Sequence, residues 1–353
     1  TLLKKLEKRV QPGQDQSALA NAYNLWAKIY SQQGQSDPAN AYLQKGKTLA
    51  LQLPDKTLAI DLLTQLATNY KNQTGALIQA QAHLEELIAL REKTKDQRNL
   101  IADHQELADL LQQTGDHPKA QLQLLKALLL AEAVRDTLQQ MELLFSLAQG
   151  YLGQNQTSTA EVYLRRSLIM AMAKKNDYKI AEIKRLQGHN QAKMGNQQQA
   201  LALYREALTG FERLGNALES GRTLVLFHQP AEAQKALIYF QKALEAKMAN
   251  HEILGEVETR LELAKLQLEL KDGRGALRSL QNCADLATQA GSRELLLASW
   301  NTLAQAHALQ GNYSAAYTFS AQYQNLKDSI YNAEQTRIIS PVPHNLIITR
   351  ILI

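Results

Sequence analysis

The sequence predicts an all-α protein, a right-handed α-solenoid of about eight stacked helix pairs. A helix-turn-helix pattern recurs at nearly constant spacing along the 353 residues. Small residues recur at fixed offsets from each turn. The composition has only 7 Pro and 17 Gly and is rich in Ala, Leu, Gln and Glu, as in an almost fully helical chain. Because stacked pairs share core only with their neighbours, we expect one elongated array rather than the two domains that length alone would suggest.

The expected turns define the repeat length. They fall 40 or 41 residues apart, with one interval of 36, at Gly34, Gly75, Gly115, Asn155, Gly195, Ala231, Lys271 and Gly311. Glycine at such a turn supplies the left-handed backbone that ends a first helix, and the Asp, Asn or Ser that often follows begins the second. The short interval lacks four residues, about one helical turn, so the register of the apolar faces is expected to survive it.

Three positions around each turn predict how the helices pack. Seven residues before the turn stand small residues, Ala27, Ala108, Ala148, Gly188, Ala264 and Ala304, with Ala67 in register if the extra residue of the second repeat lies in its turn. Five after it stand Ala39, Ala80, Ala120, Ala160, Ala200, Ala236, Ala276 and Ala316. Nine after it stand larger residues: Leu43, Leu84, Leu124, Leu164, Tyr204, Phe240 and Leu280. Small residues let the two helices of a pair cross closely, and the larger ones fill the space to the next pair.

From Asn21 to Lys327 this pattern resembles the tetratricopeptide repeat (TPR) family. The best match runs from Leu186-Gln187-Gly188 through Met194-Gly195-Asn196 to Ala200 and Leu208. The family unit is usually about 34 residues, so a 40-residue step resembles its long-helix subclass. The family's closing proline is mostly absent here, and Leu224 and Phe227 stand where a small residue and Tyr are customary.

The predicted organisation has four parts. Residues 1–10 are expected to be the second helix of a repeat that begins before Thr1, residues 11–328 the repeat array, residues 329–340 an extension of the last helix, and residues 341–353 an apolar tail. Pro341 and Pro343 end the preceding helix. The tail is open to four interpretations: a docking strand, the start of a further segment, an addition foreign to the natural chain, or a poorly ordered end. Its apolar run of eight residues is too short to span a membrane.

The last helix is expected to run from Ser314 to Ile338. Its apolar residues are spaced four, three, four and three apart, at Phe319, Tyr323, Leu326, Ile330 and Ala333. This is the spacing of a coiled-coil seam and predicts dimerisation through this helix. Residues 326–334 also resemble the junction in bacterial signalling proteins where a TPR array leads to a kinase, cyclase or DNA-binding output. The alternative is an amphipathic helix that caps the last repeat.

Charge and cysteine content point to no special partner. The formal charge is +5, but the basic pairs are scattered among Glu and Asp, aromatic residues make up 6%, and no nucleic-acid-binding motif is present, so we expect no nucleic acid partner. The single Cys283 sits at a small-residue packing position and is expected to be a buried structural thiol. Localisation stays open: periplasmic for the input domain of a membrane sensor, otherwise cytoplasmic.

No motif predicts catalysis. The eight His form neither an HExxH motif nor a site with paired Cys, and no phosphate-binding loop or nucleophile elbow is present. The pair Gly221-Arg222 has no neighbouring motif and is interpreted as isolated. We therefore expect a protein that is not an enzyme and that uses no metal or cofactor.

The concave face is the expected site. In a right-handed stack, residues thirteen, ten, six and three before each turn line a groove, which predicts as ligand-binding residues Asn24, Lys28, Thr68, Lys71, Gln105, Asp109, Gln149, Glu182, Arg185, His189, Lys265, Asn301 and Gln305. Amide side chains can donate to and accept from an extended backbone, so this lining suits a peptide or an extended protein segment. The alternative is that these positions are merely solvated. Arg185 and Lys28 are the predicted anchors, whose charge reversal should weaken binding by roughly tenfold or more without a loss of helicity.

Two functions follow from the resemblance and the groove. The first is the sensory or protein-interaction input part of a bacterial signalling protein. The second is a free-standing TPR scaffold or adaptor for multiprotein complexes. A carboxylate clamp for chaperone tails is not expected, because Asn24 precedes Lys28 in the reverse of the order that such a clamp needs.

Overall fold

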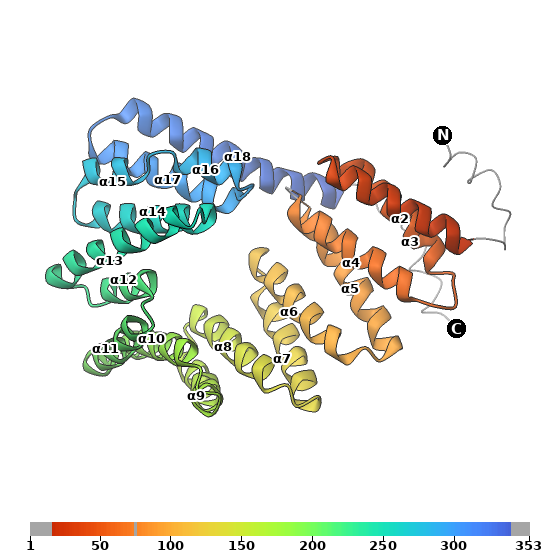
Figure 1. Cartoon of the computed structure of the whole chain (residues 1–353), viewed down its shortest axis with the longest axis horizontal. Coiled ribbons are helices and arrows are strands. Elements are labelled where there is room, and N and C mark those ends of the chain that lie inside the picture. The colour runs from red at the N-terminus through yellow and green to blue at the C-terminus, as the bar shows by residue number, and fades with distance from the viewer. Residues whose placement is uncertain (1–15, 74–75, 340–353) are drawn as a thin grey trace. The chain divides into compact units, whose positions relative to one another are not determined.

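The computed structural model describes residues 16–73 and 76–339, and these residues form helices joined by short turns, with no strand (Figure 1). The predictions for residues 1–10 and for the tail 341–353 lie outside the described residues. The chain divides into two compact units. Unit one is Thr1–Leu143 with Ser329–Ile353, and unit two is Leu144–Asp328.

Unit one contains three complete helix pairs. They are α2 (Gln16–Gln32) with α3 (Ser36–Ala50), α4 (Thr57–Asn72) with α5 (Leu77–Thr94), and α6 (Gln97–Gln113) with α7 (His117–Ala133). The unit also includes the first part of α8 (Thr137–Gly153). In each pair the alanine five residues after the turn, Ala39, Ala80 or Ala120, is buried.

Unit two continues the same alternation of first and second helices. It holds the rest of α8 with α9 (Thr157–Ala173), α10 (Asp177–Lys193) with α11 (Gln197–Arg213), α12 (Ala217–Val225) with α13 (Pro230–Ala249), α14 (Ile253–Glu269) with α15 (Gly273–Ser279) and α16 (Cys283–Gln289), and α17 (Arg293–Leu309) with α18 (Tyr313–Ile339) up to Asp328. In α18 the ring of Phe319 stacks on His307 of α17, with centroids 5.5 Å apart. Phe319, a residue of the predicted coiled-coil seam, therefore packs on its own repeat.

Most predicted turns have the expected backbone. Positive φ angles occur at Gly34, Gly115, Asn155, Gly195, Lys271 and Gly311. The turn predicted at Ala231 is wrong: Ala231 lies inside α13, and the chain reverses at His228, where φ is 51°. Pro230 begins α13 because proline is tolerated at the first helical position. The register change is therefore shared by the two helices of this pair: α12 has 9 residues where α10 has 17, and α13 has 20 where α11 has 17.

The crossing of each helix pair depends on matched side-chain sizes. In most pairs Ala stands on the first helix where the corresponding residue of the second helix is Leu, and Gly stands there where that residue is aromatic. A Cβ atom added to Gly188 would lie 2.5 Å from Cε1 of Tyr204, and one added to Gly221 would lie 2.6 Å from Cε1 of Phe240. Gly221 lies seven residues before the true turn at His228. The interpretation of Gly221 as isolated was therefore wrong.

We predict strong coupling between residues 188 and 204. Gly188→Ala should overpack the crossing at a cost of roughly 1–3 kcal/mol, partly offset by the higher helix propensity of alanine, about 1 kcal/mol. Adding Tyr204→Leu recreates the Ala–Leu pair of other repeats and should recover stability, with a coupling energy of about 1 kcal/mol or more in urea unfolding. Gly153→Ala is the control, because a Cβ there meets no atom within 4 Å. Additive effects of G188A and Y204L would contradict this account of the crossing.

The second helix of the seventh repeat is interrupted. Residues 280–282 separate α15 from α16, and Asn282 has a left-handed backbone with φ of 62°. Cys283 follows the break and is fully buried, as predicted, and burial raises the pKa of its thiol to about 12. The thiol is therefore protonated at neutral pH and serves packing.

A buried ion pair joins repeats two and three in unit one. Nη1 of Arg91 in α5 donates to both carboxylate oxygens of Asp103 in α6, each at 2.7 Å. Burial raises the pKa of Asp103 to about 6 and outweighs the opposing effect of Arg91. The folded protein therefore holds this proton at pH values where the unfolded chain, with an Asp pKa of about 3.9, has lost it.

We predict a pH-dependent contribution from Asp103. Its folded pKa lies above the unfolded value, so its stabilising effect is complete below about pH 4 and is lost as the pH rises to about 6. Asp103→Asn removes this titration. The free energy of unfolding of Asp103→Asn relative to wild type should therefore rise between pH 4.5 and pH 7 in urea titrations. Parallel pH profiles for the two proteins would disprove the assignment.

Candidate functional site

First helices of four successive repeats line one cavity in unit two. Its volume is about 430 Å³, and it is bounded by Phe145 and Gln149 of α8, Glu182, Arg185, Leu186 and His189 of α10, Arg222 of α12 with Leu226 directly after that helix, and Glu262 of α14. We call these nine residues the groove site. It brings together four of the residues predicted from sequence: Gln149, Glu182, Arg185 and His189.

Helical register explains why these side chains converge. Gln149, His189 and Arg222 each lie six residues before a turn, at Asn155, Gly195 and His228 respectively. Because residues in the same register of stacked helices face the same side, they line up across α8, α10 and α12. Sequence analysis missed Arg222 because it placed that turn at Ala231. The proline at residue 230 was the signal that could have corrected the register.

A chain of alternating charges runs along one rim of the groove site. Glu219 of α12 is buried and accepts hydrogen bonds from Nη1 of Arg185 and, at 2.8 Å, from Nη1 of Arg222. Nη2 of Arg222 lies 3.8 Å from Oε1 of Glu262, and Nζ of Lys265 lies 3.4 Å from the same oxygen. Because each charge has an opposite neighbour, the rim is close to neutral.

Arg222 is the centre of this chain. Burial lowers the pKa of Arg222, but the hydrogen bond and charge of Glu219, with Glu262 and Glu258, together outweigh burial and raise the pKa. Nη2 of Arg222 lies 3.9 Å from Oε2 of Glu258. Its guanidinium is therefore held between α12 and α14, and it is only partly committed to Glu262 and Glu258 at these longer distances.

The floor of the cavity is apolar. Phe145 is 9% exposed, and Leu186 and Leu226 lie beside it in the lining. Nζ of Lys179 lies 4.5 Å from the centroid of the Phe145 ring and 2.7 Å from Oε2 of Glu182. The lysine covers one side of the aromatic ring and neutralises the carboxylate, which leaves the remaining apolar surface facing the cavity.

Two polar side chains of the groove site have unused hydrogen-bonding capacity. Within the described part of the chain, neither Gln149 nor His189 forms a side-chain hydrogen bond or an ion pair, and Gln149 is exposed. Burial, followed by the charge of Lys193, lowers the pKa of His189. Its imidazole is therefore neutral at pH 7 and presents one donor and one acceptor. An amide and a neutral imidazole can each donate to and accept from a peptide backbone.

The predicted residues of unit one do not share this site. They are Asn24, Lys28, Thr68, Lys71, Gln105 and Asp109. Asn24 is buried, and its side-chain oxygen accepts from Nε2 of Gln65 at 3.1 Å, so its prediction as a ligand-binding residue is corrected to a link between neighbouring repeats. Nζ of Lys71 pairs with Oε1 of Glu106 at 2.9 Å. The others remain predictions for a surface of unit one.

The remaining predictions in unit two concern Lys265, Asn301 and Gln305, which are exposed but do not line the cavity. The anchor prediction also needs revision. Arg185 is already bound to the buried Glu219, and its guanidinium carbon lies 5.3 Å from the centroid of Phe211. Replacement of Arg185 by Glu would place two carboxylates together in a half-buried site, so a loss of helicity is expected for this variant.

The described residues also limit other kinds of site. Among them, no three His, Cys, Asp or Glu side chains are arranged to hold a metal ion. No helix in residues 16–73 or 76–339 is both long and apolar enough to cross a membrane.

Comparison with known proteins supports the class. The sequence matches no protein-family profile and no curated protein. Solved structures do match: the apo form of RapI, with 12% identity and a TM-score of 0.53 over 89% of this chain and 99% of that one, and a Rap protein complexed with competence and sporulation factor, with 16% identity and a TM-score of 0.50 over 91% and 100%. A TPR protein from Parabacteroides merdae matches with 14% identity and a TM-score of 0.51 over 80% and 99%.

These likenesses establish a fold. The protein is an all-α helical-repeat solenoid of the TPR type, as the sequence predicted. The match to the two Rap structures spans nearly all of both chains, so the resemblance concerns the whole repeat array.

We predict that Glu219 stabilises unit two. Glu219→Gln keeps the shape but leaves Arg185 and Arg222 facing a neutral amide, which should cost about 2 kcal/mol because the pair is only partly screened by solvent. Glu206→Gln is the control: Glu206 pairs with Lys184 at 2.8 Å but is 56% exposed, and its loss should cost about 0.5 kcal/mol or less. Equal effects of both variants in urea unfolding would refute the role of Glu219.

Proposed function

We propose that this chain is a non-catalytic repeat domain that binds an extended peptide segment of a protein partner in the groove site. The observation that carries the proposal is the convergence of unused hydrogen-bonding groups on Gln149 and His189 beside the apolar floor of Phe145, Leu186 and Leu226. Ligand sites usually combine an apolar lining with a few placed polar groups.

The chemistry of the groove site favours a peptide over other ligands. Gln149 and His189 can satisfy a backbone carbonyl and N–H, and the apolar floor can take one side chain of the segment. The charged rim is nearly neutral, so a polyanion such as a nucleic acid gains little from it. A segment with one acidic side chain could pair with Arg222, whose contacts to Glu258 and Glu262 are long.

The fold comparison is consistent with this proposal. A solved structure that this chain resembles over nearly its full length holds a bound factor, the competence and sporulation factor. From this comparison we propose for this chain only the general mode of binding, in which a helical-repeat array binds a ligand.

For the biological role, we propose the input part of a signalling protein. The observation that favours it is the length of α18, which has 27 residues where α17 has 17. A helix that continues beyond its repeat can transmit a change from the array to whatever it contacts. The alternative is a scaffold or adaptor, in which α18 caps the last repeat. Ligand-induced change in amide exchange along α18 would favour input, and an unchanged α18 would favour an adaptor.

We predict that peptides selected on the full chain require the groove site. The probe is a library of displayed linear peptides, and the recovered peptides are measured by calorimetry. The double variant Gln149→Ala with His189→Ala should lower their affinity by roughly thirtyfold, because two lost hydrogen bonds to the backbone are worth about 1 kcal/mol each. Gln198→Ala, at an exposed position of α11, is the matched control.

Circular dichroism should be unchanged for the double variant, because Gln149 is exposed and neither side chain holds another residue. If the double variant binds the selected peptides as tightly as wild type, the groove site is not where they bind.

A further inference from the structure

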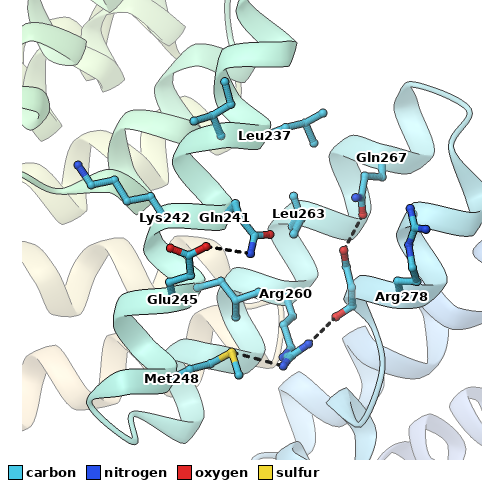
Figure 2. A pocket seen from close by; sticks show the side chains of 13 residues that line it. Leu237, Gln241, Lys242, Glu245, Met248, Arg260, Leu263, Gln267 and Arg278 are labelled. Carbon is cyan, nitrogen blue, oxygen red and sulfur yellow. Dashed lines mark hydrogen bonds between the residues drawn. The ribbon is translucent and has the colours of Figure 1, made fainter.

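A second groove lies on the side of unit two formed by the second helices. Figure 2 shows the residues that line this cavity, which belong to α13, α14 and α15. Its volume is about 750 Å³. Ile238 and Met248 of α13, Leu263 of α14, and Arg278 and Ser279 of α15 contribute to its lining. We call it the α13/α15 groove. It shares no residue with the groove site, so a ligand of the α13/α15 groove is independent of the peptide proposed for the groove site.

The seventh repeat has a smaller residue than the other repeats at one position that lines the α13/α15 groove. Eight residues after the predicted turn, every other repeat carries a larger side chain: Tyr42, His83, Gln123, Tyr163, Leu203, Tyr239 and Phe319. The rings of Tyr42, Tyr163 and Phe319 stack on the first helix of their own pair. The hydroxyl of Tyr239 reaches the preceding second helix instead and donates to Oε1 of Glu212 in α11 at 2.6 Å. The seventh repeat has Ser279 instead, whose hydroxyl reaches only Oε1 of Gln267 in α14, at 2.7 Å.

Small residues of α15 line the same cavity. Gly275 precedes Ser279 by one helical turn, and both line the cavity beside the exposed Arg278. A Cβ atom on Gly275 would clash with Oδ2 of Asp272, so the Asp272 side chain already occupies the space beside the glycine.

The opposite wall is a helix ridge with exposed apolar side chains. Ile238, Gln241, Glu245 and Met248 of α13 are spaced three, four and three apart and so share one face of the helix. Ile238 is 69% exposed and Met248 is 45% exposed. Helices pack by fitting such ridges against the grooves of another helix, so this wall is suited to a further helix.

The lining carries an excess of positive charge. It contains three cations, Lys242, Arg260 and Arg278, and one carboxylate, Glu245. Arg260 is neutralised by Glu256, with Nε at 2.8 Å from Oε1. Within the described residues, the side chains of Lys242 and Arg278 form no hydrogen bond or ion pair, and both residues are exposed. The groove thus combines apolar side chains with two exposed cations and one carboxylate, Glu245.

We propose that the α13/α15 groove docks an amphipathic helix of a partner protein whose apolar face is flanked by carboxylates. The apolar face covers Ile238, Met248 and Leu263, and the carboxylates meet Lys242 and Arg278. A second copy of this chain fits less well, because a two-fold contact through the groove would bring its cations together. A nucleic acid would leave the apolar floor without a partner.

The test uses a displayed library of helix-forming peptides with randomised faces. Binders to the full chain are selected and then depleted on Ser279→Tyr, which narrows the groove with the residue that three other repeats carry at this position. The surviving peptides are measured by fluorescence anisotropy. We expect them to carry Leu, Ile or Met in one stripe with Glu or Asp beside it. We also expect Arg278→Glu to weaken them by about tenfold or more.

Arg274→Glu is the matched control. It makes the same charge change on an exposed residue of the same helix that does not line the groove, and should weaken affinity clearly less than Arg278→Glu, because Arg274 does not contact the bound helix. Arg278 is exposed, so its replacement tests the site even if Ser279→Tyr does not fold. The proposal is overturned if no peptide survives depletion, if survivors are basic, or if Arg278→Glu and Arg274→Glu act alike. It is also overturned if duplex DNA or anionic vesicles, but no peptide, bind through Arg278.

Discussion

The structure depends on how closely the two helices of each pair cross. The distance is set by one residue on each helix, Ala against Leu in most repeats and Gly against an aromatic ring at Gly188 with Tyr204 and Gly221 with Phe240. Since protein interiors are packed as tightly as crystals, neither helix can rotate without leaving a void or a clash. This fixes the register of the first helices, and the register in turn decides which residues face the groove site.

The same constraint explains the charged rim. Once α10, α12 and α14 are held in register, Arg185, Glu219 and Arg222 are placed side by side in a half-buried position. Such groups are tolerated because each finds an opposite charge. As a consequence, the guanidinium of Arg185 is bound to Glu219 within the protein and is not free for a ligand. Specific contacts with a ligand then fall to groups that the network leaves free, chiefly Gln149 and His189.

Sequence alone predicted the fold and part of the candidate site. The spacing of alanines around each turn identified the helix pairs, because that spacing records the crossing directly. The periodicity of the sequence could not assign Arg222 to the groove. It shows that one repeat is shorter but does not show where, and in the structure α12 is short and the turn lies at His228. It also could not show that Asn24 is buried against Gln65, because a polar residue at a groove position looks the same whether it faces solvent or a neighbouring repeat.

The most direct measurement is hydrogen–deuterium exchange of the full chain with and without a peptide recovered by affinity selection. Our account predicts protection on the first helices α8, α10, α12 and α14, on segments that include Gln149 and His189, with the second helices α9 and α11 unchanged. Protection confined to second helices, or none at saturating peptide, would contradict the claim that aligned first helices form the binding surface.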